Sequence, residues 1–113
     1  MVARNAGELS TLEYHVLLAM ADGPMYGYAV KDAVERESAG TLTPRAGSLY
    51  RVIARLMTWG MVDEADDVAS GEPHPGRARR YYGLTPVGRS ALASEARRLR
   101  QAAALAERRL GPT

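Results

Sequence analysis

The dipeptide Thr-Pro occurs twice in the sequence, at Thr43-Pro44 and Thr85-Pro86, and a run with helical periodicity follows each copy. A threonine side chain caps the free N–H groups of a helix start, and proline is favoured at the first helical position because its missing N–H costs nothing there. The first of these helices is expected to end at Gly60, and the second runs almost to the end of the chain. Two helices must therefore flank one short connecting segment.

The connecting segment has the pattern of a β-hairpin. A short strand begins at Met61, and residues 70–76 are rich in turn-forming residues. From Arg79 to Leu84 the side chains alternate between two faces, as in a returning strand. The hairpin therefore joins the two helices.

Two shorter helices precede this unit. Ser10 and Glu13 form a capping box, which starts a helix that is expected to run to about Ala21. Residues 22–24, Asp-Gly-Pro, break the chain, and a second helical pattern covers residues 26–38.

The order of elements is therefore helix, helix, helix, hairpin and long helix. Three short helices with a hairpin form a winged helix-turn-helix, which commonly lays its third helix in the major groove of DNA. We expect a mainly α fold with a small β-hairpin, that is, a winged helix-turn-helix plus a long C-terminal helix. Residues 1–85 are the expected DNA-binding domain, and residues 86–113 are the expected dimerisation helix.

Four segments carry a combined motif in this order. They are Tyr26-Gly27-Tyr28, Gly47-Ser48-Leu49-Tyr50-Arg51, Leu56 to Val62, and Arg79 to Thr85 followed by Gly88. In their order and spacing they resemble the PadR family of transcriptional regulators. The resemblance implies a dimeric, repressor-like regulator whose terminal helices pack against the partner subunit. DNA binding in this family is often relieved by a small effector, such as a phenolic or planar drug-like molecule. Members that sandwich flat ligands use a tryptophan on the terminal helix, and this terminal helix has no aromatic residue.

Composition narrows the class of protein. The chain of 113 residues has no cysteine, so disulfides and thiolate metal sites are excluded and a reducing cytosol is compatible. Its longest apolar stretch, residues 16–21, is far shorter than the roughly 20 residues that span a bilayer, and its first residues lack the apolar region of a signal peptide. His15 and His74 lack metal-ligand spacing, and no cofactor or catalytic motif is present. We expect a cytoplasmic protein that is not an enzyme, without metal or cofactor.

Charge is unevenly distributed along the chain. Residues 1–76 hold six basic and eleven acidic side chains, whereas residues 77–113 hold nine basic and two acidic ones. This asymmetry indicates a polyanionic partner for the second half, although solvated helix faces would give the same pattern.

The third helix carries the expected base-reading side chains. Ser48, Arg51 and Arg55 fall on the face opposite its apolar stripe, and arginine binds either guanine edges or phosphates. Thr43 and Gly47 lie at its start, where free N–H groups favour a phosphate. The alternative is that the arginines only solvate an exposed helix.

Two tyrosines are interpreted differently. Tyr26 begins the second helix, and its hydroxyl either contacts the DNA backbone or stays hydrated above a packed ring. Tyr50 falls on the apolar side of the third helix and is expected to support the core.

In the hairpin, Arg77, Arg79 and Arg80 flank a Gly-Pro loop that can reach along the duplex, so they are expected to contact phosphates. The acidic run 63–67 on the other strand is the alternative partner of these arginines, in exposed pairs worth about 0 to 1 kcal/mol.

The terminal helix has an apolar seam at alternating steps of four and three residues, which predicts a helical partner, most simply a second copy. The seam residues are Leu92, Ala96, Leu99, Ala103, Ala106 and Leu110. The alternative is that the seam folds back on its own domain. Trp59, four residues after Arg55, is expected to stack on that arginine or to cover the dimer surface. A further hypothesis is that it lines an effector pocket near the subunit boundary.

Together these patterns predict a sequence-specific transcriptional regulator. We expect a homodimer that binds a palindromic double-stranded DNA operator, and a small-molecule effector is implied by the resemblance. The alternative is a winged-helix protein-interaction module that grips an acidic protein without reading DNA, because the fold alone does not decide function.

Overall fold

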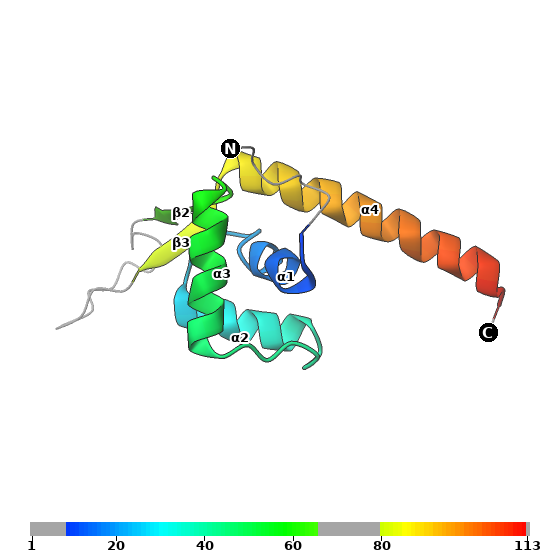
Figure 1. Cartoon of the computed structure of the whole chain (residues 1–113), viewed down its shortest axis with the longest axis horizontal. Coiled ribbons are helices and arrows are strands. Elements are labelled where there is room, and N and C mark those ends of the chain that lie inside the picture. The colour runs from blue at the N-terminus through cyan, green and yellow to red at the C-terminus, as the bar shows by residue number, and fades with distance from the viewer. Residues whose placement is uncertain (1–8, 66–79, 113) are drawn as a thin grey trace.

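The computed structural model describes residues 9–65 and 80–112 and confirms a winged helix fold (Figure 1). Three short helices pack around one core, a small antiparallel sheet lies beside the third helix, and a long helix leaves the body. In chain order the elements are α1 (Thr11–Ala19), β1 (Met25–Tyr26), α2 (Gly27–Glu37), α3 (Ala46–Thr58), β2 (Val62–Ala65), β3 (Tyr81–Leu84) and α4 (Pro86–Leu110).

The core lies where α1, α2 and α3 meet. Val16 of α1, Val30 of α2 and Leu49 of α3 are all completely buried, and they belong to one apolar cluster. On α3 the buried residues recur every three or four positions, so one face of that helix is committed to the core and the opposite face to the outside.

The predicted capping box of α1 is confirmed. The Glu13 backbone N–H donates to the Ser10 hydroxyl at 3.1 Å, and the Ser10 backbone N–H donates to the Glu13 carboxylate at 2.8 Å. The helix ends at Ala19, slightly before the predicted Ala21.

The start of the third helix was predicted wrongly. α3 begins at Ala46 with Arg45 as its N-cap, so Thr43 does not cap it and lies exposed ahead of it. The reason lies at the end of α2, where the Ser38 hydroxyl accepts a hydrogen bond from the Leu42 backbone at 3.0 Å. That contact holds the chain against α2, and residues 43–45 are then needed to carry it across to α3.

The sheet has a third strand that sequence reasoning missed. β1 pairs with β3, with Met25 opposite Tyr82 and Tyr26 opposite Tyr81, and the strand order is β1-β3-β2. β2 and β3 form the predicted hairpin, with Val62 opposite Leu84. A strand of two residues is too short to show any periodicity, so β1 follows only from the tertiary pairing.

α4 begins as predicted, with Thr85 as its cap and Pro86 in its first turn. Only its first turns are packed, since Ala91 and Leu92 are buried in the core whereas Leu110 is 78% exposed. The 25 residues of the helix span about 37 Å, and its second half projects away from the body (Figure 1). In the part of the chain that is described, no helix is both long and apolar enough to cross a membrane.

Candidate nucleic-acid interface

The first turns of α3 present a polar face away from the core. The Arg51 guanidinium donates to the Ser48 hydroxyl at 3.3 Å. A side chain added at Gly47 would meet one Arg51 nitrogen at 3.7 Å, so the guanidinium lies back along the start of the helix. Gly47, Ser48 and Arg51, all predicted from the sequence, are thus brought together at the end of α3 that normally contacts bases.

Arg45 adds a cation that sequence reasoning missed. It is exposed, and it is the N-cap residue of α3, with an extended backbone (φ −75°, ψ 157°). Its charge therefore stands at the positive end of the helix dipole, next to the face formed by Ser48 and Arg51. The available signal was an arginine directly after Pro44, which the incorrect helix start placed inside the helix.

Arg55, the third predicted contact on α3, is tied to α1 instead of pointing freely outward. Its Nε donates to the Glu13 carboxylate at 3.0 Å, and the Glu13 side chain is only 2% exposed. The guanidinium also lies 5.8 Å from the centre of the Trp59 ring, which confirms the predicted stacking. Since Glu13 belongs to the capping box, this contact joins the start of α1 to the last turn of α3. Arg55 is therefore a positioning residue, and its contact with DNA stays a prediction.

Glu13→Gln is expected to lower the free energy of unfolding by about 1 to 3 kcal/mol, because it weakens a charged hydrogen bond in a buried position. Urea denaturation followed by circular dichroism measures this. The matched control is Glu37→Gln, because Glu37 pairs with Arg36 at 3.7 Å on the exposed end of α2 and such pairs change stability by less than about 0.5 kcal/mol. Equal losses in the two variants would contradict a special role for Glu13.

In the wing, the hairpin formed by β2 and β3, Arg80 immediately precedes β3. Arg80 is exposed and pairs with Glu64 of β2 at 3.3 Å, with both side chains at least half exposed. The predicted alternative, in which the acidic run 63–67 pairs with the wing arginines, is therefore present for Arg80. An exposed pair of this kind contributes only about 0 to 1 kcal/mol, so a phosphate can readily replace the carboxylate. Arg77 and Arg79 lie outside the described residues.

Tyr26 is held in the sheet. Its ring meets the Tyr81 ring edge to face at 5.8 Å, and its backbone pairs with that residue in β1 and β3. Ordinary packing is thus present for the half-buried ring, and a DNA contact through its hydroxyl stays a prediction.

The apolar seam of α4 divides into two parts. Leu92 lies in the core of its own domain, so this residue is reassigned from the dimer interface to the core. The seam residues beyond it reach the surface progressively, because the helix has by then left the body. They are Ala96, which is half-buried, and Leu99, Ala103, Ala106 and Leu110, which are exposed.

A buried acid marks the point where α4 leaves the core. The Glu95 side chain is 2% exposed, and both of its carboxylate oxygens accept hydrogen bonds from Arg98. That guanidinium lowers the pKa of Glu95 from its ordinary value, so the carboxylate stays charged. Both residues line a hollow of about 170 Å³ between α1 and α4, beside the exposed Leu99.

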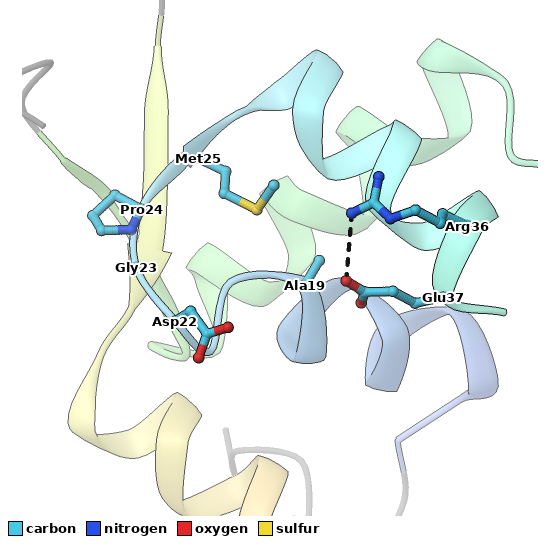
Figure 2. A pocket seen from close by; sticks show the side chains of 7 residues that line it. All are labelled: Ala19, Asp22, Gly23, Pro24, Met25, Arg36 and Glu37. Atoms are coloured by element: carbon cyan, nitrogen blue, oxygen red, sulfur yellow. Dashed lines mark ion pairs between the residues drawn. The ribbon is translucent and has the colours of Figure 1, made fainter. Parts of the chain in front are cut away.

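A second hollow, of about 310 Å³, lies between the turn after α1 and the end of α2 (Figure 2). Asp22 and the pair Arg36 and Glu37 surround it. Trp59 lines neither of these hollows and instead packs, half-buried, against the core. Neither hollow therefore supports the predicted effector pocket beside Trp59.

Comparison with known sequences finds one matching family and a relative in Streptomyces. The transcriptional regulator PadR-like family matches residues 16–94. An uncharacterized 37.1 kDa protein in transposon TN4556 of Streptomyces fradiae is 43% identical over 81 residues, which make up 72% of this chain and 21% of that protein. The chain thus spans about a fifth of the length of this relative.

Solved structures resemble this fold at low sequence identity. A PadR-like transcriptional regulator from Bacillus cereus has a TM-score of 0.72 at 18% identity, covering 90% of this chain and 93% of that chain. A PadR family transcription regulator from Clostridium difficile has a TM-score of 0.71 at 18% identity, covering 90% of this chain and 100% of that chain. Bacillus subtilis PadR in complex with operator DNA has a TM-score of 0.63 at 17% identity, covering 75% of this chain and 46% of that chain.

Proposed function

Because the chain belongs to the PadR-like family of transcriptional regulators, we propose that it is a ligand-responsive repressor that binds a palindromic DNA operator as a homodimer. The observation that carries this proposal is the cationic face at the start of α3. Arg45, Ser48 and Arg51 lie on one exposed end of that helix. The same helix contacts β2, whose Glu64 pairs with Arg80. The similar fold of a PadR that is seen in complex with operator DNA supports operator binding by this chain.

In this proposal α3 enters the major groove and the wing follows the backbone. Arg51 reads a base edge, because its guanidinium donates to Ser48 at 3.3 Å on the outer face of α3 and a planar fork suits the O6 and N7 atoms of guanine. Arg80 exchanges Glu64 for a phosphate, and Arg77, Arg79 and the backbone at Gly47 add further phosphate contacts.

Two copies are needed to read a palindrome. The exposed part of the seam, from Leu99 to Leu110, has no place on its own domain and supports pairing of α4 with α4 of a second copy. In such a pair each copy has one reading head, made of α3 and the wing. The two reading heads would meet half-sites roughly 34 to 36 Å apart.

An effector acts, in this proposal, by changing the distance between the two heads, since a ligand shifts a two-state equilibrium only through its different affinity for the two states. Trp59 adjoins Arg55 and so lies at the joint between α1 and α3. A titration of candidate effectors followed by Trp59 fluorescence tests this part, and unchanged emission at saturation would contradict a ligand beside that ring. The protein would act in the cytoplasm, on the DNA upstream of its own gene.

The experiment that tests the DNA proposal is an electrophoretic mobility shift on the protein's own promoter fragment and on scrambled DNA, each at two salt concentrations. The wild-type protein is expected to prefer the promoter and to bind less tightly at higher salt. Arg51→Ala is expected to weaken promoter binding by about 1 to 3 kcal/mol and to relax the preference over scrambled DNA, because a base contact is lost.

The matched control is Arg97→Ala, which removes an exposed arginine from α4, far along the chain from the reading head. It is expected to leave the promoter preference unchanged. Equal and weak binding of the wild-type protein to both fragments would contradict operator recognition and favour the protein-interaction module.

A further inference from the structure

Two exposed tyrosines, one in the first turn of α2 and one near the start of α3, were not among the DNA contacts predicted from the sequence. Tyr28, in the first turn of α2, is 61% exposed, and Tyr50 of α3 is 45% exposed. Tyr50 was expected to support the core, but it stands about 100° around the helix from Arg51 and reaches the surface. Within residues 9–65 and 80–112, neither hydroxyl makes a hydrogen bond. Both groups are therefore available to a partner.

The position of Tyr50 depends on a glycine in the neighbouring helix. A Cβ atom added at Gly27 would lie 2.2 Å from the Tyr50 hydroxyl oxygen and 2.6 Å from two of its ring carbons. Gly27 does not have a positive φ, so its backbone conformation does not require glycine. Glycine is required at this position because the Tyr50 ring approaches so closely. The phenol ring of Tyr50 therefore lies across Gly27, the first residue of α2.

This contact lies where three elements of the reading head meet. Burial raises the pKa of Tyr82 on β3, and the nearby Tyr50 adds to that shift, so Tyr50 adjoins the wing strand as well as α2. Arg80 and Glu64 also lie close to Tyr82. Tyr50, on the helix proposed to read bases, thus lies against the start of α2 and near the strand that carries the wing.

We infer that the hydroxyls of Tyr50 and Tyr28 donate hydrogen bonds to the DNA backbone at the edge of the groove, and that Gly27 is glycine in order to place Tyr50 there. This inference rests on the proposed DNA binding. Backbone contacts of this kind fix the register and depth of a recognition helix and carry no sequence information. A tyrosine suits the role because its ring is rigid and its hydroxyl is a neutral donor.

Because the tyrosine hydroxyl is uncharged, its loss differs from the loss of an arginine in its effect on the salt dependence of DNA binding. A lost arginine–phosphate contact reduces the salt dependence of binding by about one unit of slope, because one counterion fewer is released. A lost hydroxyl leaves that slope unchanged. Tyr50→Phe is expected to weaken binding to promoter and scrambled DNA alike, by about tenfold each, with the same salt slope as the wild-type protein. Tyr28→Phe is expected to act in the same direction.

The test is the mobility shift described above, applied to Tyr50→Phe and Tyr28→Phe, with Tyr14→Phe on α1 as the matched control. Tyr14 is half-buried beside His15 and the α1–α4 hollow, so its variant should bind DNA like the wild-type protein. Wild-type affinity of Tyr50→Phe would overturn the inference, as would a reduced salt slope. Absence of selective binding by the wild-type protein itself would instead overturn the proposed function.

A double-mutant cycle tests the role of Gly27. Gly27→Ala is expected to displace Tyr50 and to reproduce the loss of affinity, whereas in a Tyr50→Ala background the same change should cost no further affinity. Circular dichroism establishes that the variants remain folded. An equal effect of Gly27→Ala in both backgrounds would overturn the link between this glycine and Tyr50.

Discussion

Gly88→Ala is expected to destabilise the protein by more than about 3 kcal/mol, enough to unfold a marginally stable domain of this size. A Cβ atom at this position would lie 2.0 Å from the Met61 carbonyl oxygen and 2.9 Å from its carbonyl carbon. Both are backbone atoms, and the same oxygen accepts a hydrogen bond from Thr85 at 3.1 Å. The obstacle therefore cannot swing aside as a flexible side chain would. Thermal and urea denaturation followed by circular dichroism measure the loss.

The matched control is Gly47→Ala, which makes the same substitution in another helix. There the nearest atom belongs to the Arg51 side chain at 3.7 Å, an ordinary contact distance. Because alanine favours a helix over glycine, this variant is expected to be as stable as the wild-type protein or more stable by up to about 1 kcal/mol. Wild-type stability of Gly88→Ala would contradict the close packing of α4 on the segment that joins α3 to β2.

The two Thr-Pro dipeptides show what a local pattern can and cannot predict. Thr85 caps α4, accepting from the Gly88 backbone N–H at 3.0 Å and donating to the Gly60 carbonyl at 2.5 Å. Thr43, with the same neighbour, caps nothing, because the preceding segment is bound to the end of α2 and α3 starts later. Whether each threonine caps a helix thus depends on contacts outside the dipeptide. For Thr85 the contact is with Gly60, 25 residues away, and for Thr43 it is the attachment of the preceding segment to the end of α2.

Prediction of the candidate interface from local sequence patterns was limited in the same way. Periodicity placed Arg51 and Arg55 correctly on the outer face of α3, and both are exposed. It could not predict that Arg55 is captured by Glu13, 42 residues earlier in the chain, because nothing near Arg55 encodes that contact. Likewise, the heptad pattern predicted one continuous seam on α4, whereas the core takes Leu92 and leaves only the later residues outside. Long-range packing redistributes roles within a correctly predicted element.

The exposed half of that seam carries the second large prediction. Leu99 is 40% exposed and Leu110 is 78% exposed, and neither belongs to the core cluster. Replacing both with glutamate keeps good helix formers on α4 but puts charges where a second copy would pack. The double variant Leu99→Glu/Leu110→Glu is expected to remain folded and to become monomeric. Light scattering measures its mass, and circular dichroism its helix content.

Loss of the dimer should have a larger effect on DNA binding than loss of any single contact. When two reading heads are linked, the second half-site is bound at a high effective concentration, so the monomeric variant is expected to bind the operator at least about 100-fold more weakly. The matched control is Val87→Glu, which charges another exposed apolar residue of α4, 56% exposed and off the seam. That variant should keep the mass and the affinity of the wild-type protein. A monomer that still bound the operator tightly would show that one head suffices and that α4 has a different use.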